Sequence, residues 1–141
     1  MNVLFVCVAN AGRSVMAERL FRSLAGGRHE ARSAGSEPGA AVHPHVLAAL
    51  EELGLDASDH VPRRLTPRLL EWADVAVSTC SEEVCPLTPG VTRVAWELPD
   101  PKGMPLAEVR AVRDELRGRV VGLVAQLDEE RSVRDRPSTA D

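Results

Sequence analysis

The chain is poor in aromatic side chains and in cysteine. Its 141 residues include no Tyr, two Phe, two Trp and three Cys. With so few aromatic rings, neither a platform that stacks nucleic-acid bases nor an aromatic groove for peptides can be built. Three thiols cannot all pair with one another, so we expect the cysteines to be buried side chains, metal ligands or redox groups rather than parts of structural disulfides.

Long apolar runs and an excess of positive charge are also absent. The longest apolar stretch, residues 3–9, is much shorter than the run of about 20 residues that a membrane-spanning helix needs. No pattern typical of a secretory signal surrounds it, so the cytoplasm is the expected location. The net charge of −4 excludes an overall attraction to nucleic acid or anionic lipid, so any bound anion must be held locally.

Strand-like and helix-like segments alternate along the chain. A hydrophobic fraction of 44% is typical of a globular protein with a packed core. Short β-prone runs predict strands over residues 3–8, 29–34, 75–78 and 92–95. Apolar residues at helical spacing, with Pro at two of the starts and Gly at two of the ends, predict helices over residues 15–25, 44–53, 67–72 and 106–127.

This alternation predicts an α/β fold with a parallel four-stranded sheet and helices on both faces. Right-handed crossovers that reverse after the second strand give the strand order 2-1-3-4. The order leaves a crevice at the carboxyl ends of the first and third strands, where we expect the active site. Residues 1–128 form a single catalytic domain in this prediction, and the polar residues 129–141 form a flexible tail.

The loop after the first predicted strand has the residues needed to bind an oxyanion. Cys7 and Arg13 flank a short segment that enters a helix. Successive backbone N–H groups and the helix dipole there point at one anion-sized hollow. The Arg13 guanidinium can bind two oxygens of a tetrahedral oxyanion at once. The predicted oxyanion-binding and thiolate-stabilising residues are Asn10, Ala11, Gly12, Arg13 and Ser14.

Cys7 is the predicted nucleophile of this site. A thiol in such a field is expected to be present as the thiolate, which is the nucleophilic form. The Ser14 hydroxyl can donate to the sulfur, and the Asn10 amide can hold backbone groups of the loop. The alternative is that Cys7 only fills core space in an apolar strand.

Three motifs together resemble the low-molecular-weight protein tyrosine phosphatase family. They are Cys7 with Arg13-Ser14, the segment Ser33-Ala34-Gly35, and Asp100-Pro101, and the resemblance covers residues 1–128. It implies the fold of that family, with Cys7 attacking the oxyanion centre, Arg13 binding its oxygens and Asp100 protonating the leaving group. Taken without the resemblance, Asp100 between two prolines is an ordinary loop residue.

The other two cysteines favour one branch of this family. Cys80 follows the third predicted strand, and neighbouring strands lie about 4.8 Å apart, so its thiol can approach Cys7. The segment with Cys80 and Cys85 is similar to the redox segment of thioredoxin-coupled arsenate reductases, which share the phosphatase fold. Two unreactive thiols in a loop are the alternative interpretation.

The resemblance implies an arsenate reductase that needs no cofactor. Cys7 forms a covalent adduct with arsenate, Cys80 displaces arsenite to form a Cys7–Cys80 disulfide, and Cys85 moves the disulfide to a place where thioredoxin reduces it. The electron donor is thioredoxin or a small thiol.

The alternative function is a phosphatase that hydrolyses phosphate monoesters through a Cys7 phosphocysteine. It is disfavoured because Lys102-Gly103 follows Asp100-Pro101, where phosphotyrosine-specific members have aromatic residues. Weak phosphatase activity is still expected of a reductase, because phosphate and arsenate have nearly the same shape.

No bound metal is predicted. Some reductases of this family hold potassium beside the loop, and Asn10, Glu18 and Ser33 match their ligands, but Arg63 stands where an Asp would be. The Arg63 charge is expected to replace the ion. A structural zinc site needs four closely spaced Cys or His ligands, and no His lies close to Cys80 or Cys85 in the sequence.

If Cys7 is inert, the chain is instead a binding module or redox partner without oxyanion chemistry.

Overall fold

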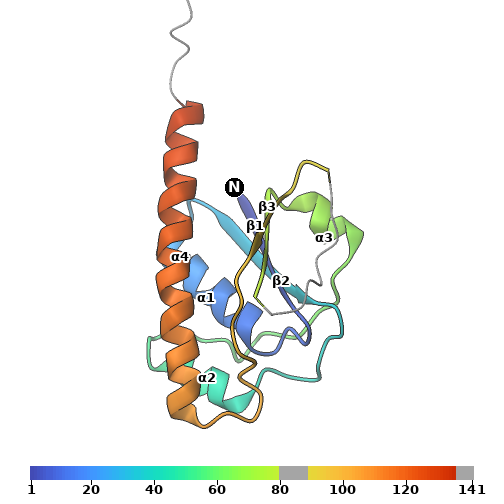
Figure 1. Cartoon of the computed structure of the whole chain (residues 1–141), viewed down its shortest axis with the longest axis vertical. Coiled ribbons are helices and arrows are strands. Elements are labelled where there is room, and N and C mark those ends of the chain that lie inside the picture. The colour runs from blue at the N-terminus through green and yellow to red at the C-terminus, as the bar shows by residue number, and fades with distance from the viewer. Residues whose placement is uncertain (80–88, 136–141) are drawn as a thin grey trace, which may run out of the picture.

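The computed structural model describes residues 1–79 and 89–135 as a parallel sheet packed between helices (Figure 1). The strands are β1 (Asn2–Cys7), β2 (Glu30–Gly35), β3 (Val75–Ser78) and β4 (Thr92–Ala95). The helices are α1 (Arg13–Ala25), α2 (Pro44–Glu51), α3 (Pro67–Trp72) and α4 (Leu106–Asp135). Within the described ranges, none of the helices is long and apolar enough to span a lipid bilayer.

The strand order is β2-β1-β3-β4 with all neighbours parallel, which confirms the predicted order 2-1-3-4. Cys7 is paired with Gly35 on β2, and Val6 is paired with Ser78 on β3. The carboxyl ends of β1, β2 and β3 therefore lie at one edge of the sheet. The loop between Cys7 and α1 starts at this edge, where the switch in strand order opens the crevice.

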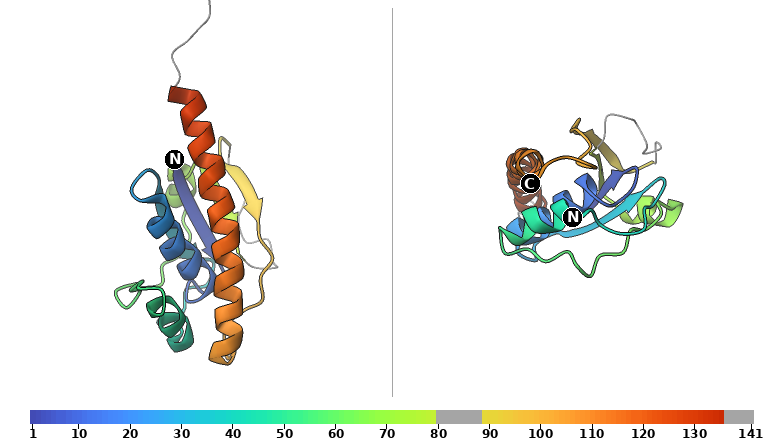
Figure 2. Two further views of the ribbon diagram at one scale, coloured as in Figure 1. Left: turned by 90° about the vertical axis from the view of Figure 1, so that its left-hand side faces the viewer. Right: turned by 90° about the horizontal axis from the view of Figure 1, so that it is seen from below.

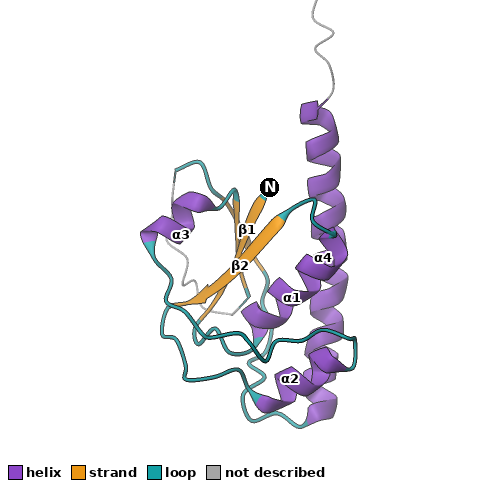
Figure 3. Ribbon diagram, turned by 180° about the vertical axis from the view of Figure 1, so that it is seen from behind, coloured by secondary structure: helices purple, strands orange, loops and turns teal. Residues whose placement is uncertain are grey.

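Helices cover the two faces of the sheet unequally, as Figures 2 and 3 show. Val3 and Phe5 of β1 belong to the larger core, which they share with α1, α2 and α4. Leu4 and Val6 point to the other face and pack with α3 in a smaller cluster. Every residue of β1 from Val3 to Cys7 is buried, because the central strand is covered on both sides.

The long helix α4 continues past the domain boundary predicted at residue 128. Residues 129–135, placed by the sequence in a polar tail, extend it to Asp135. Polar contacts link the end of the helix to residues 28 and 29: Asp128 pairs with Arg28 and His29, and Arg131 donates to the Arg28 carbonyl. A pattern of apolar residues does not detect such contacts, and so it ended the helix too early.

Candidate active site

The loop between β1 and α1 is tied down from outside through its carbonyl groups. Backbone N–H groups of residues 36–43 donate to the carbonyls of Cys7, Val8, Ala9 and Ala11 at 2.8–3.2 Å. These carbonyls therefore face residues 36–43, away from the interior of the loop. With the carbonyls turned outward, N–H groups of the loop can point toward a common centre, which is the arrangement that binds an anion.

Two unusual backbone positions shape this loop. Asn10 has a φ of +51°, in the left-handed region that Asn adopts more readily than most residues. Gly35 of β2 lies directly against the loop, where a Cβ atom would be 2.4 Å from the Val8 carbonyl oxygen and 2.9 Å from the Asn10 nitrogen. Only glycine fits at position 35 without moving the loop backbone.

The Cys7 thiol lies at the base of the loop with two polar neighbours. Its Sγ is 2.9 Å from the Ser14 Oγ, and the Asn10 backbone N–H donates to it at 3.2 Å. The residue is only 2% exposed. The sulfur thus has one N–H donor and one hydroxyl partner near the N-terminus of α1, surroundings that favour a thiolate and that a side chain filling space does not need.

Asn10 links the thiol to a histidine that the sequence did not indicate. Its Nδ2 donates to the Ser14 Oγ at 2.9 Å. Its Oδ1 accepts from the His60 Nε2 at 2.9 Å and from the Arg63 backbone N–H at 3.0 Å. Burial is the main cause that lowers the pKa of His60, which favours a neutral imidazole. Because its Nε2 faces an amide oxygen, the proton is on that nitrogen. The amide thus orients Ser14 toward Cys7.

Arg13 begins α1 and connects the loop to residues 98–104, which form a second wall of the site. Its side chain is nearly buried, and Nη1 donates to the Leu98 carbonyl at 2.9 Å. One arm of the guanidinium is thereby fixed to the chain just before Asp100. A planar group held in this way presents its remaining N–H groups in a defined direction.

Asp100 lies in this second wall, residues 98–104, and is exposed to solvent. Its Oδ1 accepts from the Lys102 backbone N–H at 3.0 Å, a contact typical of an Asx turn. The next residue, Pro101, packs on the loop so closely that a Cβ atom on Gly12 would lie 2.7 Å from the Pro101 Cγ. Asp100 is thus one residue away from direct contact with the loop, a position open to both a general acid and a turn residue.

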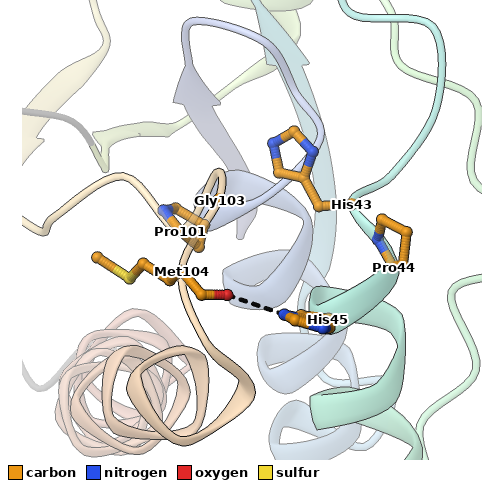
Figure 4. Close-up of a pocket in the computed structure, with 6 residues that line it drawn as sticks. All are labelled: His43, Pro44, His45, Pro101, Gly103 and Met104. Atoms are coloured by element: carbon orange, nitrogen blue, oxygen red, sulfur yellow. Dashed lines mark hydrogen bonds between the residues drawn. The ribbon is translucent and has the colours of Figure 1, made fainter.

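A pocket of about 270 Å³ lies beside the second wall (Figure 4). It is lined by His43, Pro44, His45, Pro101, Gly103 and Met104. The His45 Nδ1 is 2.8 Å from the Met104 carbonyl oxygen, a contact that joins the N-terminus of α2 to the second wall. His43 and Pro101 also approach Gly12, so these two residues lie between the pocket lining and the loop.

Cys80 and Cys85 lie outside the described residues. The chain is described up to Thr79, which is buried and whose backbone N–H donates to the Val6 carbonyl at 2.9 Å. Thr79 therefore lies beside the end of β1, where its N–H bonds the residue that precedes Cys7. In the part of the chain that is described, no three His, Cys, Asp or Glu side chains gather as a metal site.

Comparisons with known proteins agree on one family and divide over activity. The family model for low molecular weight phosphotyrosine protein phosphatase matches residues 2–133. An arsenate reductase of Brevibacillus brevis is 37% identical over 122 residues, which are 84% of this chain and 90% of that protein. The likeness to a curated reductase therefore runs through nearly the whole chain.

The similar solved structures include both an arsenate reductase and a phosphatase. A thioredoxin-dependent arsenate reductase of Corynebacterium glutamicum is similar with a TM-score of 0.78 and 36% identity, covering 92% of this chain and 62% of that one. This chain is thus shorter than that reductase and spans less than two thirds of it. The arginine phosphatase YwlE, in a cysteine-to-serine mutant with a phosphorylated active site serine, is similar with a TM-score of 0.79 and 27% identity, covering 94% and 99% of the two chains.

Proposed function

The chain belongs to the low molecular weight phosphotyrosine protein phosphatase family, and from this premise we propose that it reduces arsenate to arsenite. The observation that carries the proposal is the Cys7 thiol, which contacts Ser14 and the Asn10 N–H at the base of an anion-binding loop. The curated relatives named arsenate reductase support the choice of substrate.

Arsenate binds in the loop through backbone N–H groups and the Arg13 guanidinium. The outward-turned carbonyls leave the interior of the loop to donors, and the N-terminus of α1 adds its positive dipole end. Arg13 is attached to Leu98 by one nitrogen, so the others hold the oxyanion. These donors stabilise the charge that develops on the oxygens as the thiolate attacks.

The first chemical step forms a sulfur–arsenic bond and releases water. The Cys7 thiolate attacks arsenic while Asp100 protonates the departing hydroxyl. Arsenic remains pentavalent in this adduct. The contact of Pro101 with Gly12 supports the role of Asp100, because it keeps the neighbouring residue against the loop.

The second step reduces arsenic. Cys80 attacks the Cys7 sulfur, the sulfur–arsenic bond breaks, and arsenite leaves with the electron pair, so that a Cys7–Cys80 disulfide remains. Cys85 then attacks Cys80, frees Cys7 and forms a Cys80–Cys85 disulfide, which thioredoxin reduces. The hydrogen bond from Thr79 to Val6 supports the first of these attacks, because it holds the residue before Cys80 beside the end of β1. A relay of free thiols needs a reducing compartment, for which we propose the cytoplasm.

A phosphatase acting through a Cys7 phosphocysteine is the second candidate. The likeness to an arginine phosphatase with a phosphorylated active site favours it, since the two chains match over almost their full lengths. The absence of Tyr and the Lys102-Gly103 pair after Pro101 count against phosphotyrosine as a substrate. We expect only weak phosphatase activity beside arsenate reduction.

Parallel assays of reduction and hydrolysis decide between these functions. With purified thioredoxin, thioredoxin reductase and NADPH, arsenite should form in step with NADPH oxidation, and hydrolysis of para-nitrophenyl phosphate should be much slower. Cys7→Ser should abolish both activities without unfolding the protein. Efficient hydrolysis without arsenite formation would establish the phosphatase instead. Loss of neither activity in Cys7→Ser, or a Cys7 that iodoacetamide does not label at mildly acidic pH, would contradict both.

A further inference from the structure

A buried carboxylate lies behind the oxyanion loop and takes no part in the proposed reaction. Glu18, on α1 one turn after Ser14, is only 2% exposed. The Ser33 hydroxyl donates to its Oε1 at 3.2 Å, and the Arg22 Nη2 is 3.5 Å from the same oxygen. Its Oε2 is 3.2 Å from the Arg19 Nε, but this pair lacks the alignment of a hydrogen bond. Arg19 therefore contributes mainly its charge.

The Arg19 guanidinium is surrounded by oxygen atoms from two parts of the chain. Besides Glu18, it contacts the Asp56 carbonyl oxygen at 3.4 Å and the Asp59 Oδ1 at 3.5 Å. Its side chain is 15% exposed, so most of it is enclosed. One carbonyl and two carboxylates are the ligand types that hard cations select. Here a side chain of the protein occupies the centre of that oxygen set.

The same contacts reach the active site through His60. Asp56 and Asp59 belong to the segment that ends at His60, whose ring bonds the Asn10 amide. Arg19 joins this segment to α1, and its charge and that of Glu18 both act on His60. Arg19 is thus connected, through this segment, to the amide that bonds Ser14.

The potassium site of some reductases in this family does not fit these residues. The Asn10 Oδ1 already accepts two hydrogen bonds, from His60 and from the Arg63 backbone, and the Glu18 carboxylate already faces two guanidinium groups. The expectation that the charge of Arg63 replaces the ion is also corrected. Arg63 is an exposed residue that contacts Asn10 through its backbone, whereas the cations beside Glu18 are Arg19 and Arg22.

We propose that Arg19 is a built-in cation: its guanidinium neutralises Glu18 and fills the oxygen set of Glu18, Asp56 and Asp59, so that the protein folds and works without a bound metal ion. Arg19 is a positioning residue, because it acts on the thiol only through the segment with His60 and through Asn10. The inference concerns the support of the loop and holds whichever oxyanion the site converts.

Thermal unfolding in different monovalent cations tests this proposal. The wild-type Tm should be the same in K⁺, Na⁺ and choline at one ionic strength. Arg19→Ala leaves a buried carboxylate short of a counter-ion, so its Tm in choline should fall by about 5 to 10 °C. K⁺ or Na⁺ should restore a large part of that loss, because the vacated oxygen set then binds a small cation. Restored stability should be accompanied by restored reactivity of Cys7 with iodoacetamide.

Matched variants separate a built-in cation from an ordinary packing residue. Arg22→Ala removes a more exposed guanidinium from the same carboxylate and should lower the Tm less, without any cation preference. Arg19→Lys keeps a positive charge beside Glu18, so its Tm should be the same in K⁺, Na⁺ and choline. This variant keeps the test valid if Arg19→Ala does not fold. Glu18→Gln with Arg19→Ala should show no cation effect, because the buried charge is gone. A wild-type Tm that rises in K⁺, or an Arg19→Ala variant that no small cation stabilises, would overturn the proposal.

Discussion

The two walls of the candidate site are built in different ways. The loop wall, residues 7–14, follows a buried strand, has four carbonyls bonded from outside, and encloses a thiol that is 2% exposed. The second wall, residues 98–104, follows the edge strand β4 and includes the exposed Asp100. It is attached to the loop wall through the Arg13 bond to Leu98 and through the packing of Pro101 on Gly12.

The difference suits the two walls to different tasks, the loop wall to oxyanion binding and the second wall to proton delivery. A loop whose carbonyls are bonded from outside can keep its N–H donors aimed at an oxyanion, which is the requirement for stabilising a transition state. Proton delivery needs a carboxyl that exchanges protons with solvent between turnovers, and an exposed residue on the second wall meets that requirement. Substitutions in the loop wall should therefore impair binding and chemistry together, and those in the second wall mainly chemistry.

Arg13→Lys should have the largest effect, because it acts on both walls. Lysine keeps the positive charge but cannot bond Leu98 and hold two oxygens of the oxyanion in one plane. We expect kcat/KM for arsenate to fall by about a hundredfold to a thousandfold, with changes in both kcat and KM. Steady-state kinetics measure this, and Arg22→Lys on the same helix is the control. Near-normal turnover in Arg13→Lys would show that the loop does not bind the oxyanion in this way.

Asp100→Asn should affect the second wall alone. The amide can still accept the Lys102 N–H, so the turn should persist, but it cannot protonate the departing hydroxyl. We expect kcat to fall by about a hundredfold with little change in KM. The rate of Cys7 alkylation should be that of the wild type. An unchanged kcat would reduce Asp100 to a turn residue.

Gly12→Ala tests the contact between the walls. The added methyl would lie 2.7 Å from the Pro101 Cγ and 3.4 Å from the His43 Cδ2, so the second wall must shift outward. We expect a fall in kcat of about tenfold, since a small displacement of an acid from its substrate lowers the rate steeply. Binding of phosphate, followed by calorimetry, should change less than kcat. Equal losses in both would mean that Gly12 serves the loop wall and not the junction.

Asp128→Asn, remote from both walls, should leave activity unchanged. Its hydrogen bond with Arg28, and then that with His29, lowers the pKa of the Asp128 carboxyl from 3.8 to about 2. Because the pKa is lower in the folded protein, its stabilising effect is present above pH 3.8 and is lost as the pH falls through about 2. The Tm of the variant should therefore fall less steeply in this acidic range. Identical slopes for variant and wild type would show that the pair contributes nothing, as exposed pairs often do.

Local patterns in the sequence were sufficient to predict the strand order and the loop that contains Cys7, Arg13 and Ser14. The apolar run before Cys7 predicted the central strand to within one residue at each end, and the alternation of elements predicted the strand order. The spacing of Cys7, Arg13 and Ser14 predicted the loop because these residues are neighbours in the chain. Their contacts therefore depend on local geometry.

Contacts between distant segments could not be predicted in this way. His60 bonds Asn10 across 50 residues, and Arg19 contacts Asp56 across 37, with no motif that marks either pair. Near the end of α4, Asp128 contacts His29 across 99 residues, and Arg131 donates to the Arg28 carbonyl. Such pairs form only when the whole sheet has brought the segments together, so a pattern read along the chain does not indicate them.

A single turnover of arsenate by Cys85→Ser tests most directly the claim that Cys7 reduces arsenic through a thiol relay. The variant should release one arsenite per chain and then stop, with a disulfide between Cys7 and Cys80 visible in peptides analysed by mass spectrometry without reduction. Cys80→Ser should stop earlier and release no arsenite. If Cys85→Ser continues to cycle with thioredoxin, the three-thiol relay is wrong, and a small thiol that acts on Cys7 becomes the better account.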